Sequence, residues 1–172
     1  MVISAGLLLY RFSSGKLEVL LVHPGGPFWA KKDNYSWSIP KGEIDPQEDV
    51  QAAAHREFGE EVGVPAPDGK SYYLGEAKLT RAKIGKIWTL EGDVDAAKVK
   101  SNTFKMESPP KSGNFQEFPE IDRGGWFKLG DAYQKIAKTQ SIFLDRLAEH
   151  LKIDKGLKDK PPAQDDVQVS LL

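Results

Sequence analysis

The stretch from residue 42 to residue 64 constrains this chain more than any other, because a glycine-containing loop leads there into a helix rich in acids. Apolar side chains recur at every fourth position of that helix, namely Val50, Ala54, Phe58 and Val62. This spacing predicts a helix over 49–62, with Gly63 as its C-cap. The apolar stripe marks the buried face of the helix.

Three acids lie three and four residues apart on the same helix: Glu57, Glu60 and Glu61. On a helical wheel of about 100° per residue, the apolar stripe covers about 0° to 120° and the acids about 280° to 20°. The acids therefore border the buried stripe instead of lying opposite it. Carboxylates in that position are partly desolvated and need a counter-charge. The alternative is an ordinary solvated, salt-bridged helix face.

A bound divalent cation is the simplest counter-charge for this acidic cluster. The chain has no cysteine, so any metal has to be held by oxygen or histidine. Mg²⁺ prefers oxygen ligands and is usually held by a few carboxylates together with the phosphates of a substrate. The pattern therefore predicts a magnesium site that takes a phosphate compound.

The residues just before the helix add to this prediction. Gly42 can bring its backbone close to a ligand, and its carbonyl can serve as an oxygen ligand. Lys41 is suited to contact a phosphate oxygen. Arg56 lies four residues before Glu60 and can fix the rotamer of Glu60 or of the loop residue Glu48.

Taken together, residues 42–64 resemble the Nudix box, G-x5-E-x7-R-E-U-x-E-E-x-G-U, where U is apolar. The specified positions are filled by Gly42, Glu48, Arg56, Glu57, Phe58, Glu60, Glu61, Gly63 and Val64. A chance match of this kind has a frequency on the order of one in ten million for a chain of this length. The order of strands and helices around the box is also similar to that family, over most of residues 1–151.

The resemblance implies an α+β fold, an α/β/α sandwich with a mixed β-sheet between helices. It also implies a hydrolase that uses Mg²⁺, or Mn²⁺, to direct water onto a phosphorus atom. By position, Glu57, Glu60 and Glu61 match the metal-binding acids and Gly42 matches the carbonyl ligand. Glu48 and Arg56 match positions that brace the loop and the helix.

The general base is left open between two acids. In this family it is either a box glutamate or an acid from a loop outside the box. Glu61 and Glu120 are the leading candidates, and Glu117 lies on the same stretch as Glu120.

The rest of the sequence predicts a mixed sheet. Strands are expected at 3–12, 17–22, 36–39, 71–79, 83–92, 103–106 and 124–127, and helices at 131–138 and 140–151. Strands and helices do not alternate regularly, which favours a mixed sheet covered by helices over a doubly wound parallel sheet.

Length and composition limit the remaining possibilities. With 172 residues, 40% of them hydrophobic, the chain suits one domain, expected over 1–153 and followed by a polar, flexible tail over 154–172. The formal charge of −1 disfavours a partner such as genomic nucleic acid. The apolar N-terminal run is too short to span a membrane and lacks a basic region before it, so a cytoplasmic enzyme, monomeric or homodimeric, is expected.

The expected substrate is a nucleotide. The run Trp37-x-x-Pro40-Lys41-Gly42 resembles the approach to the box in dinucleoside polyphosphate hydrolases. A nucleoside triphosphate pyrophosphohydrolase is nearly as well supported, and a hydrolase of ADP-ribose or a nucleoside diphosphate sugar comes third. A non-catalytic module that senses nucleotides is the alternative from another class. Trp37, Phe28 and Trp29 are candidates for stacking on a nucleobase, against the alternative that they belong to the core.

Overall fold

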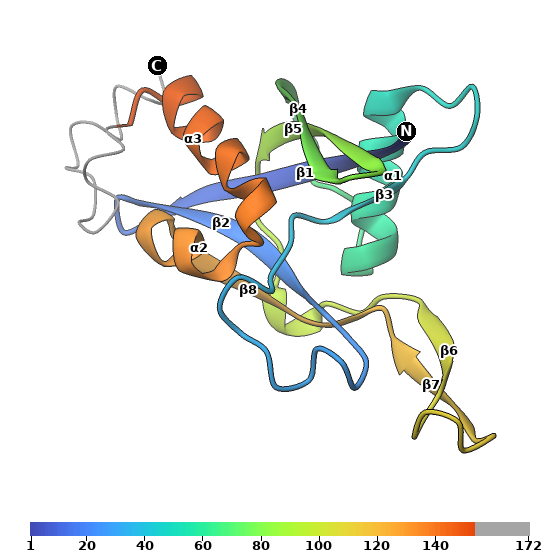
Figure 1. The fold of residues 1–172 in the computed structure, drawn as a ribbon. Helices are drawn as coiled ribbons and strands as arrows, with labels where there is room; N and C mark the ends of the chain where they lie inside the picture. Colours follow the sequence, from blue (N-terminus) through green and yellow to red (C-terminus); the bar gives the residue numbers. More distant parts are fainter. Residues whose placement is uncertain (154–172) are drawn as a thin grey trace.

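The computed structural model describes residues 1–153, so the predicted tail lies outside the described residues. A six-stranded sheet forms the centre of the fold, in the order β4-β5-β1-β2-β8 with β3 paired to β1 (Figure 1). Its strands are β1 (Val2–Ser13), β2 (Lys16–Pro24), β3 (Lys41–Glu43), β4 (Tyr72–Thr80), β5 (Lys83–Glu91) and β8 (Ile121–Lys128). Strands β1 and β5 are parallel and the other pairs are antiparallel, so the sheet is mixed as predicted.

Strand β1 is buried on both faces because helices cover both sides of the sheet. Leu7 and Leu9 lie in one core cluster with Phe58 of the helix α1 (Val50–Val62). Leu8 and Tyr10 point the other way, into a core shared with α2 (Leu129–Lys135) and α3 (Ser141–His150). Alternate residues of one strand thus serve two cores, which is why its sequence is almost continuously apolar.

The arrangement confirms the predicted α/β/α sandwich of the α+β class. In Figure 1, α1 lies on one side of the sheet and α2 and α3 lie on the other. Two 3-10 turns, η1 (Ala96–Lys98) and η2 (Lys138–Gln140), complete the helical elements in residues 1–153. None of the helices described there is long and apolar enough to cross a membrane.

A separate two-stranded hairpin projects from the body (Figure 1). It consists of β6 (Thr103–Glu107) and β7 (Phe115–Pro119). The sequence predicted a strand at 103–106, in agreement with β6, but gave no strand for β7. Most side chains of β7 are exposed, so the segment lacks the apolar alternation by which a strand is recognised.

The strand predicted at 36–39 is wrong. The residues there make only two isolated bridges, Val22 to Ser38 and Trp37 to Ile136. A short strand, β3, begins after Pro40, where the sequence predicted a break. The carbonyl of Pro40 accepts from the backbone N–H of Leu7 at 3.1 Å, so the proline, which has no N–H of its own, still joins the chain to β1.

Candidate active site

Helix α1 is fixed at both ends by local hydrogen bonds. The side chain of Asp49 caps its first turn by accepting from the backbone N–H of Ala52 at 2.9 Å. Gly63 ends the helix with φ of 87°, and a Cβ there would lie 2.2 Å from the carbonyl oxygen of Lys100. Both the positive φ and the close contact require glycine, and together they hold the acidic end of α1 against the body.

Glu57 reaches from α1 onto the backbone of β3. Glu57 is buried, and its carboxylate lies where a side chain at Gly42 would be. A Cβ at Gly42 would be 2.0 Å from Oε2 of Glu57. The missing side chain of Gly42 therefore forms a cradle for this carboxylate. Burial raises the pKa of Glu57, Arg56 opposes the shift, and the neighbouring carboxylate of Glu60 adds to it.

Glu61 lies beside Glu57 and faces the same strand. Its Oε2 accepts from the backbone N–H of Lys41 at 2.9 Å. Burial raises the pKa of Glu61 to about 7, the nearby charge of Lys41 opposes this shift, and the carboxylates of Glu57 and Glu120 increase it. Two carboxylates whose pKa burial raises therefore lie close enough for the charge of one to act on the other.

Lys41 places its ammonium near this pair. Burial lowers its pKa, the carboxylate of Glu61 opposes that shift, and the neighbouring Lys83 adds to it. Strand β3 sets the position of Lys41 by pairing it with Gly6 of β1. The segment just before β3 is held from another element: the buried side chain of Gln140 accepts from the N–H of Ile39 at 2.9 Å.

Arg56 connects three of the predicted site residues. Its Nε and Nη2 donate to the two oxygens of Glu48, at 2.7 and 3.1 Å, which is a bidentate pair. Its Nη1 lies 2.9 Å from Oε1 of Glu57 and 3.0 Å from Oε1 of Glu60. The carboxylate of Glu48 also accepts from the N–H of Asp45, so the loop before α1 is tied to the helix through this arginine.

The structure brings Glu57 and Glu61 together on β3, whereas Glu60 is exposed and bound to Arg56. Within residues 1–153, no group of three or more His, Cys, Asp or Glu side chains stands ready to hold a metal ion. Nη1 of Arg56 holds Glu57 and Glu60, and the Lys41 amide holds Glu61. A cation at this place requires the carboxylates to rotate.

The chemistry of the site nevertheless fits a hard divalent cation. Glu57 and Glu61 supply carboxylate oxygens, and burial raises the pKa of both. The Gly42 cradle brings the carboxylate of Glu57 against the backbone of β3, so that carboxylate and backbone oxygens, the ligands of a hard cation, lie in one place. A cation would add positive charge beside acids whose pKa is raised even with Arg56 and Lys41 close by.

The two acids outside the box differ in position. Glu120 lies between β7 and β8 and is exposed, and its charge helps to raise the pKa of Glu61. Its backbone is held by Gly25 and Asn102. Glu117 lies farther out on β7, where its carboxylate accepts from Thr103. Of the two, only Glu120 is placed to influence the acids of α1.

The three candidate stacking residues differ in how far they are exposed to solvent. Trp37 is buried, its ring packs on Phe127 at 4.8 Å and on His23 at 5.2 Å, and its Nε1 donates to Asp33. It is a core residue and is not available to a base. Phe28, by contrast, is 62% exposed.

Sequence reasoning missed the long-range contacts of Gln140 and His23. Both are buried polar residues with partners about 100 residues away, Ile39 for the first and Asp122 for the second. Gln140 was expected only as the start of a helix. Nothing in the local sequence marks these long-range contacts.

Comparison with known proteins points to one family. A family model described as NUDIX domain matches residues 2–147. An RNA pyrophosphohydrolase of Salmonella paratyphi B is 26% identical over 153 residues, which cover 84% of this chain and 85% of that protein. A bis(5'-nucleosyl)-tetraphosphatase of Caenorhabditis elegans is 41% identical over 61 residues, which cover 36% of this chain and only 40% of that protein.

Solved structures agree with the fold. A C. elegans Ap4A hydrolase in a binary complex has a TM-score of 0.59 and 25% identity, with 88% of this chain and 98% of that chain covered. The NUDIX domain of Shewanella oneidensis NrtR, crystallised with ADP ribose, has a TM-score of 0.58 at 17% identity, with 88% of each chain covered. The second likeness concerns the fold alone.

Proposed function

The chain belongs to the NUDIX domain family, and on that premise we propose that it is a Mg²⁺-dependent hydrolase of a phosphoanhydride bond in a nucleoside polyphosphate. The observation that carries the proposal is the pair Glu57 and Glu61. The carboxylate of Glu57 fills the Gly42 cradle, that of Glu61 accepts from the neighbouring Lys41 amide, and burial raises the pKa of each. Acids kept in such a place are best explained by a cation that binds there together with substrate phosphates.

Each box residue has a role in this proposal. Glu57, Glu60, Glu61 and the Gly42 carbonyl would hold the ion, and Mn²⁺ could take its place. When bound, the ion would neutralise negative charge on the phosphate oxygens and lower the pKa of the attacking water. Lys41 would contact a substrate phosphate with its ammonium.

Arg56 and Glu48 would act by positioning. The bidentate pair between them fixes the loop before α1, and Nη1 of Arg56 holds Glu57 and Glu60 within reach of β3. When the ion binds, Arg56 would release Glu57 and Glu60 to it. The pair between Arg56 and Glu48 would remain and keep the helix and the loop in place.

Proton removal from the attacking water falls to Glu61 or Glu120. Burial raises the pKa of Glu61 to about 7, a value suited to taking a proton near neutral pH. Glu120 is exposed and lies across from Glu61, on the loop that enters β8. Glu120→Gln separates the two, because this acid is not a proposed metal ligand. A large loss of kcat at saturating Mg²⁺ would identify Glu120 as the base, and turnover near the wild-type rate would leave Glu61.

The relatives support the substrate class. The names of the matched proteins describe hydrolysis of a dinucleoside tetraphosphate and of pyrophosphate on RNA, and both substrates are nucleotides with a phosphate chain. A dinucleoside polyphosphate or a nucleoside triphosphate is therefore the first candidate here. A module that only senses nucleotides is the competing proposal, and it gives no reason for the complete acid set. The cytoplasmic location and the monomeric or homodimeric state stay predictions.

A nucleotide panel tests this proposal. Dinucleoside polyphosphates, nucleoside triphosphates and ADP-ribose are incubated with and without Mg²⁺ in ¹⁸O water, and the products are identified by mass spectrometry. We expect Mg²⁺-dependent release of a phosphate or pyrophosphate fragment, with the label naming the phosphorus attacked. Tight binding without turnover of any compound would contradict the enzyme and favour the sensor.

A further inference from the structure

The loop between β2 and β3 presents an aromatic pair to solvent. Phe28 is 62% exposed, and the ring of Trp29 meets it edge-on with centroids 5.0 Å apart. Nζ of Lys32 lies 3.5 Å from the centroid of the Phe28 ring, which is a close cation-π contact. Phe28 is therefore a large aromatic side chain that stays in water beside a cation, whereas hydrophobic burial alone would remove it from solvent.

The loop that carries this pair is fixed at several points. Nε2 of His23 lies 2.6 Å from the carbonyl oxygen of Lys32, and the backbone N–H of Lys32 donates to the carbonyl of Trp29 at 2.9 Å. Asp33 accepts from Trp37 at 2.8 Å and from Lys135. These contacts hold the aromatic pair in one orientation, and such preorganisation favours binding of a rigid partner.

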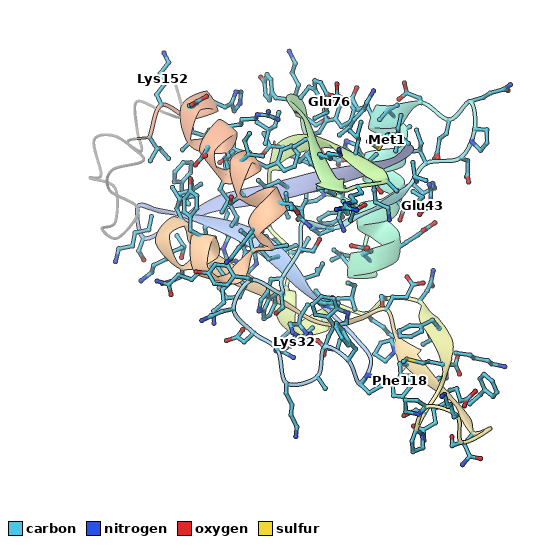
Figure 2. All side chains as sticks on the ribbon, viewed as in Figure 1. Met1, Lys32, Glu43, Glu76, Phe118 and Lys152 are labelled. Carbon is cyan, nitrogen blue, oxygen red and sulfur yellow. The ribbon has the colours of Figure 1, made fainter. Side chains whose placement is uncertain are left out.

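The same loop borders the acidic site through the hairpin. The backbone N–H of Gly25 donates to the carbonyl of Glu120 at 2.9 Å, and a Cβ at Gly26 would lie 2.9 Å from Cζ of Phe104. The loop therefore packs directly on β6 and on the residue that faces Glu61. Figure 2 shows Lys32 on this loop and Phe118 on the hairpin, on the same side of the molecule.

We propose that Phe28 and Trp29 form the platform on which the nucleobase of the substrate stacks, while its phosphates extend to the carboxylates on α1. This inference rests on the proposed function. A nucleotide joins a flat base to a phosphate chain, and the loop that carries the aromatic pair is hydrogen-bonded at Gly25 to Glu120, an acid close enough to Glu61 to shift its pKa. Lys32 keeps the ring of Phe28 in place and adds positive charge on the path of the anion.

The test compares ATP with ribose 5-triphosphate, which has the same sugar and phosphates and no base. Dissociation constants are measured by calorimetry with Mg²⁺ in the Glu61→Gln background, so that hydrolysis does not interfere. We expect ATP to bind more tightly than the baseless compound. Phe28→Ala is expected to weaken ATP binding by about tenfold and to leave ribose 5-triphosphate unchanged. Phe28→Tyr is expected to keep the preference.

Tyr72→Ala is the matched control, because Tyr72 is an exposed aromatic residue under a lysine, with Nζ of Lys70 at 5.2 Å, and it lies on β4. It should change neither constant. Equal affinity for the two ligands in the parent protein, or an equal loss for both in Phe28→Ala, would overturn the platform. If the wild-type protein hydrolyses no nucleotide and the base preference still depends on Phe28, the proposed activity fails and the platform stands.

Discussion

The carboxylate of Glu57 occupies the space that a side chain at Gly42 would fill, since a Cβ there would lie 2.0 Å from Oε2. Gly42→Ala should therefore move this acid off β3. We expect kcat to fall by about a hundredfold, because displacement of a reacting group by about 1 Å has an effect of that size. Crowding should also destabilise the fold by about 1–3 kcal/mol. Kinetics and urea denaturation measure both, and an active Gly42→Ala variant would show that Glu57 does not act from this cradle.

Gly59 is a glycine that α1 does not need. A Cβ there meets only the carbonyl oxygen of Val64, at 3.8 Å, which is ordinary van der Waals contact. Gly59→Ala should raise the free energy of unfolding by roughly 0.5–1 kcal/mol, since alanine suits a helix interior better than glycine. Denaturation measures the gain, and kcat/KM should not change. A loss of activity without loss of stability would show that something approaches the helix at this point during turnover.

Arg56→Lys should weaken Mg²⁺ binding without unfolding the protein. Lysine keeps the charge but cannot make the bidentate pair with Glu48 while also reaching Glu57 and Glu60. We expect a loss of about 10- to 100-fold in Mg²⁺ affinity, read from activity against Mg²⁺ concentration. Lys83→Arg serves as a control, because Lys83 makes one ion pair, with Glu43, at the edge of the site. Unchanged Mg²⁺ dependence in Arg56→Lys would remove the positioning role.

Helix α1 could be predicted from sequence because its information is local. The four-residue spacing of Val50, Ala54, Phe58 and Val62 gives the helix, and the box letters identify the acids along it. The layers of the sandwich could be predicted from the same kind of signal, since alternating strands and striped helices each mark their buried faces.

The contacts that shape the site could not be predicted in this way, because they join distant residues. The N–H of Ile39 donates to the side chain of Gln140, and the N–H of Gly25 donates to the carbonyl of Glu120. The exposed strand β7 has no apolar alternation, and β3 follows a proline that is normally a sign of a strand's end. The sequence grouped Glu57, Glu60 and Glu61 correctly on one helix but could not show that Arg56 binds Glu57 and Glu60 while Glu61 accepts from the Lys41 amide.

The metal-free protein should lose stability as pH rises from about 4.5 to about 7. Burial raises the pKa of Glu61 from 4.5 to about 7, so the folded state keeps a proton that the unfolded chain has already released. The contribution of this group is therefore complete below the unfolded pKa and is lost as pH rises through the folded pKa. Urea denaturation in EDTA between about pH 5 and pH 8 measures this slope.

Two comparisons make the pH experiment specific to the site. Glu61→Gln cannot ionise and should flatten the slope while keeping an oxygen to accept from the Lys41 amide. Mg²⁺ should stabilise the wild-type protein more at the higher pH, because the ion binds the ionised carboxylate. Equal slopes in wild type and Glu61→Gln would show that Glu61 does not carry this charge.

His23→Phe should loosen the aromatic loop while preserving the core. His23 is buried, its ring packs edge-on against Trp37, and its nitrogens lie 2.9 Å from Oδ1 of Asp122 and 2.6 Å from the carbonyl oxygen of Lys32. Phenylalanine keeps a ring beside Trp37 and removes both polar contacts, leaving the Lys32 carbonyl and the Asp122 carboxylate without this partner. The free energy of unfolding should fall by about 1–3 kcal/mol. Because Lys32 then loses its anchor, the preference for ATP over ribose 5-triphosphate should shrink as well. If stability falls and the base preference stays at the wild-type value, the His23 contacts hold the fold but do not orient the Phe28 ring.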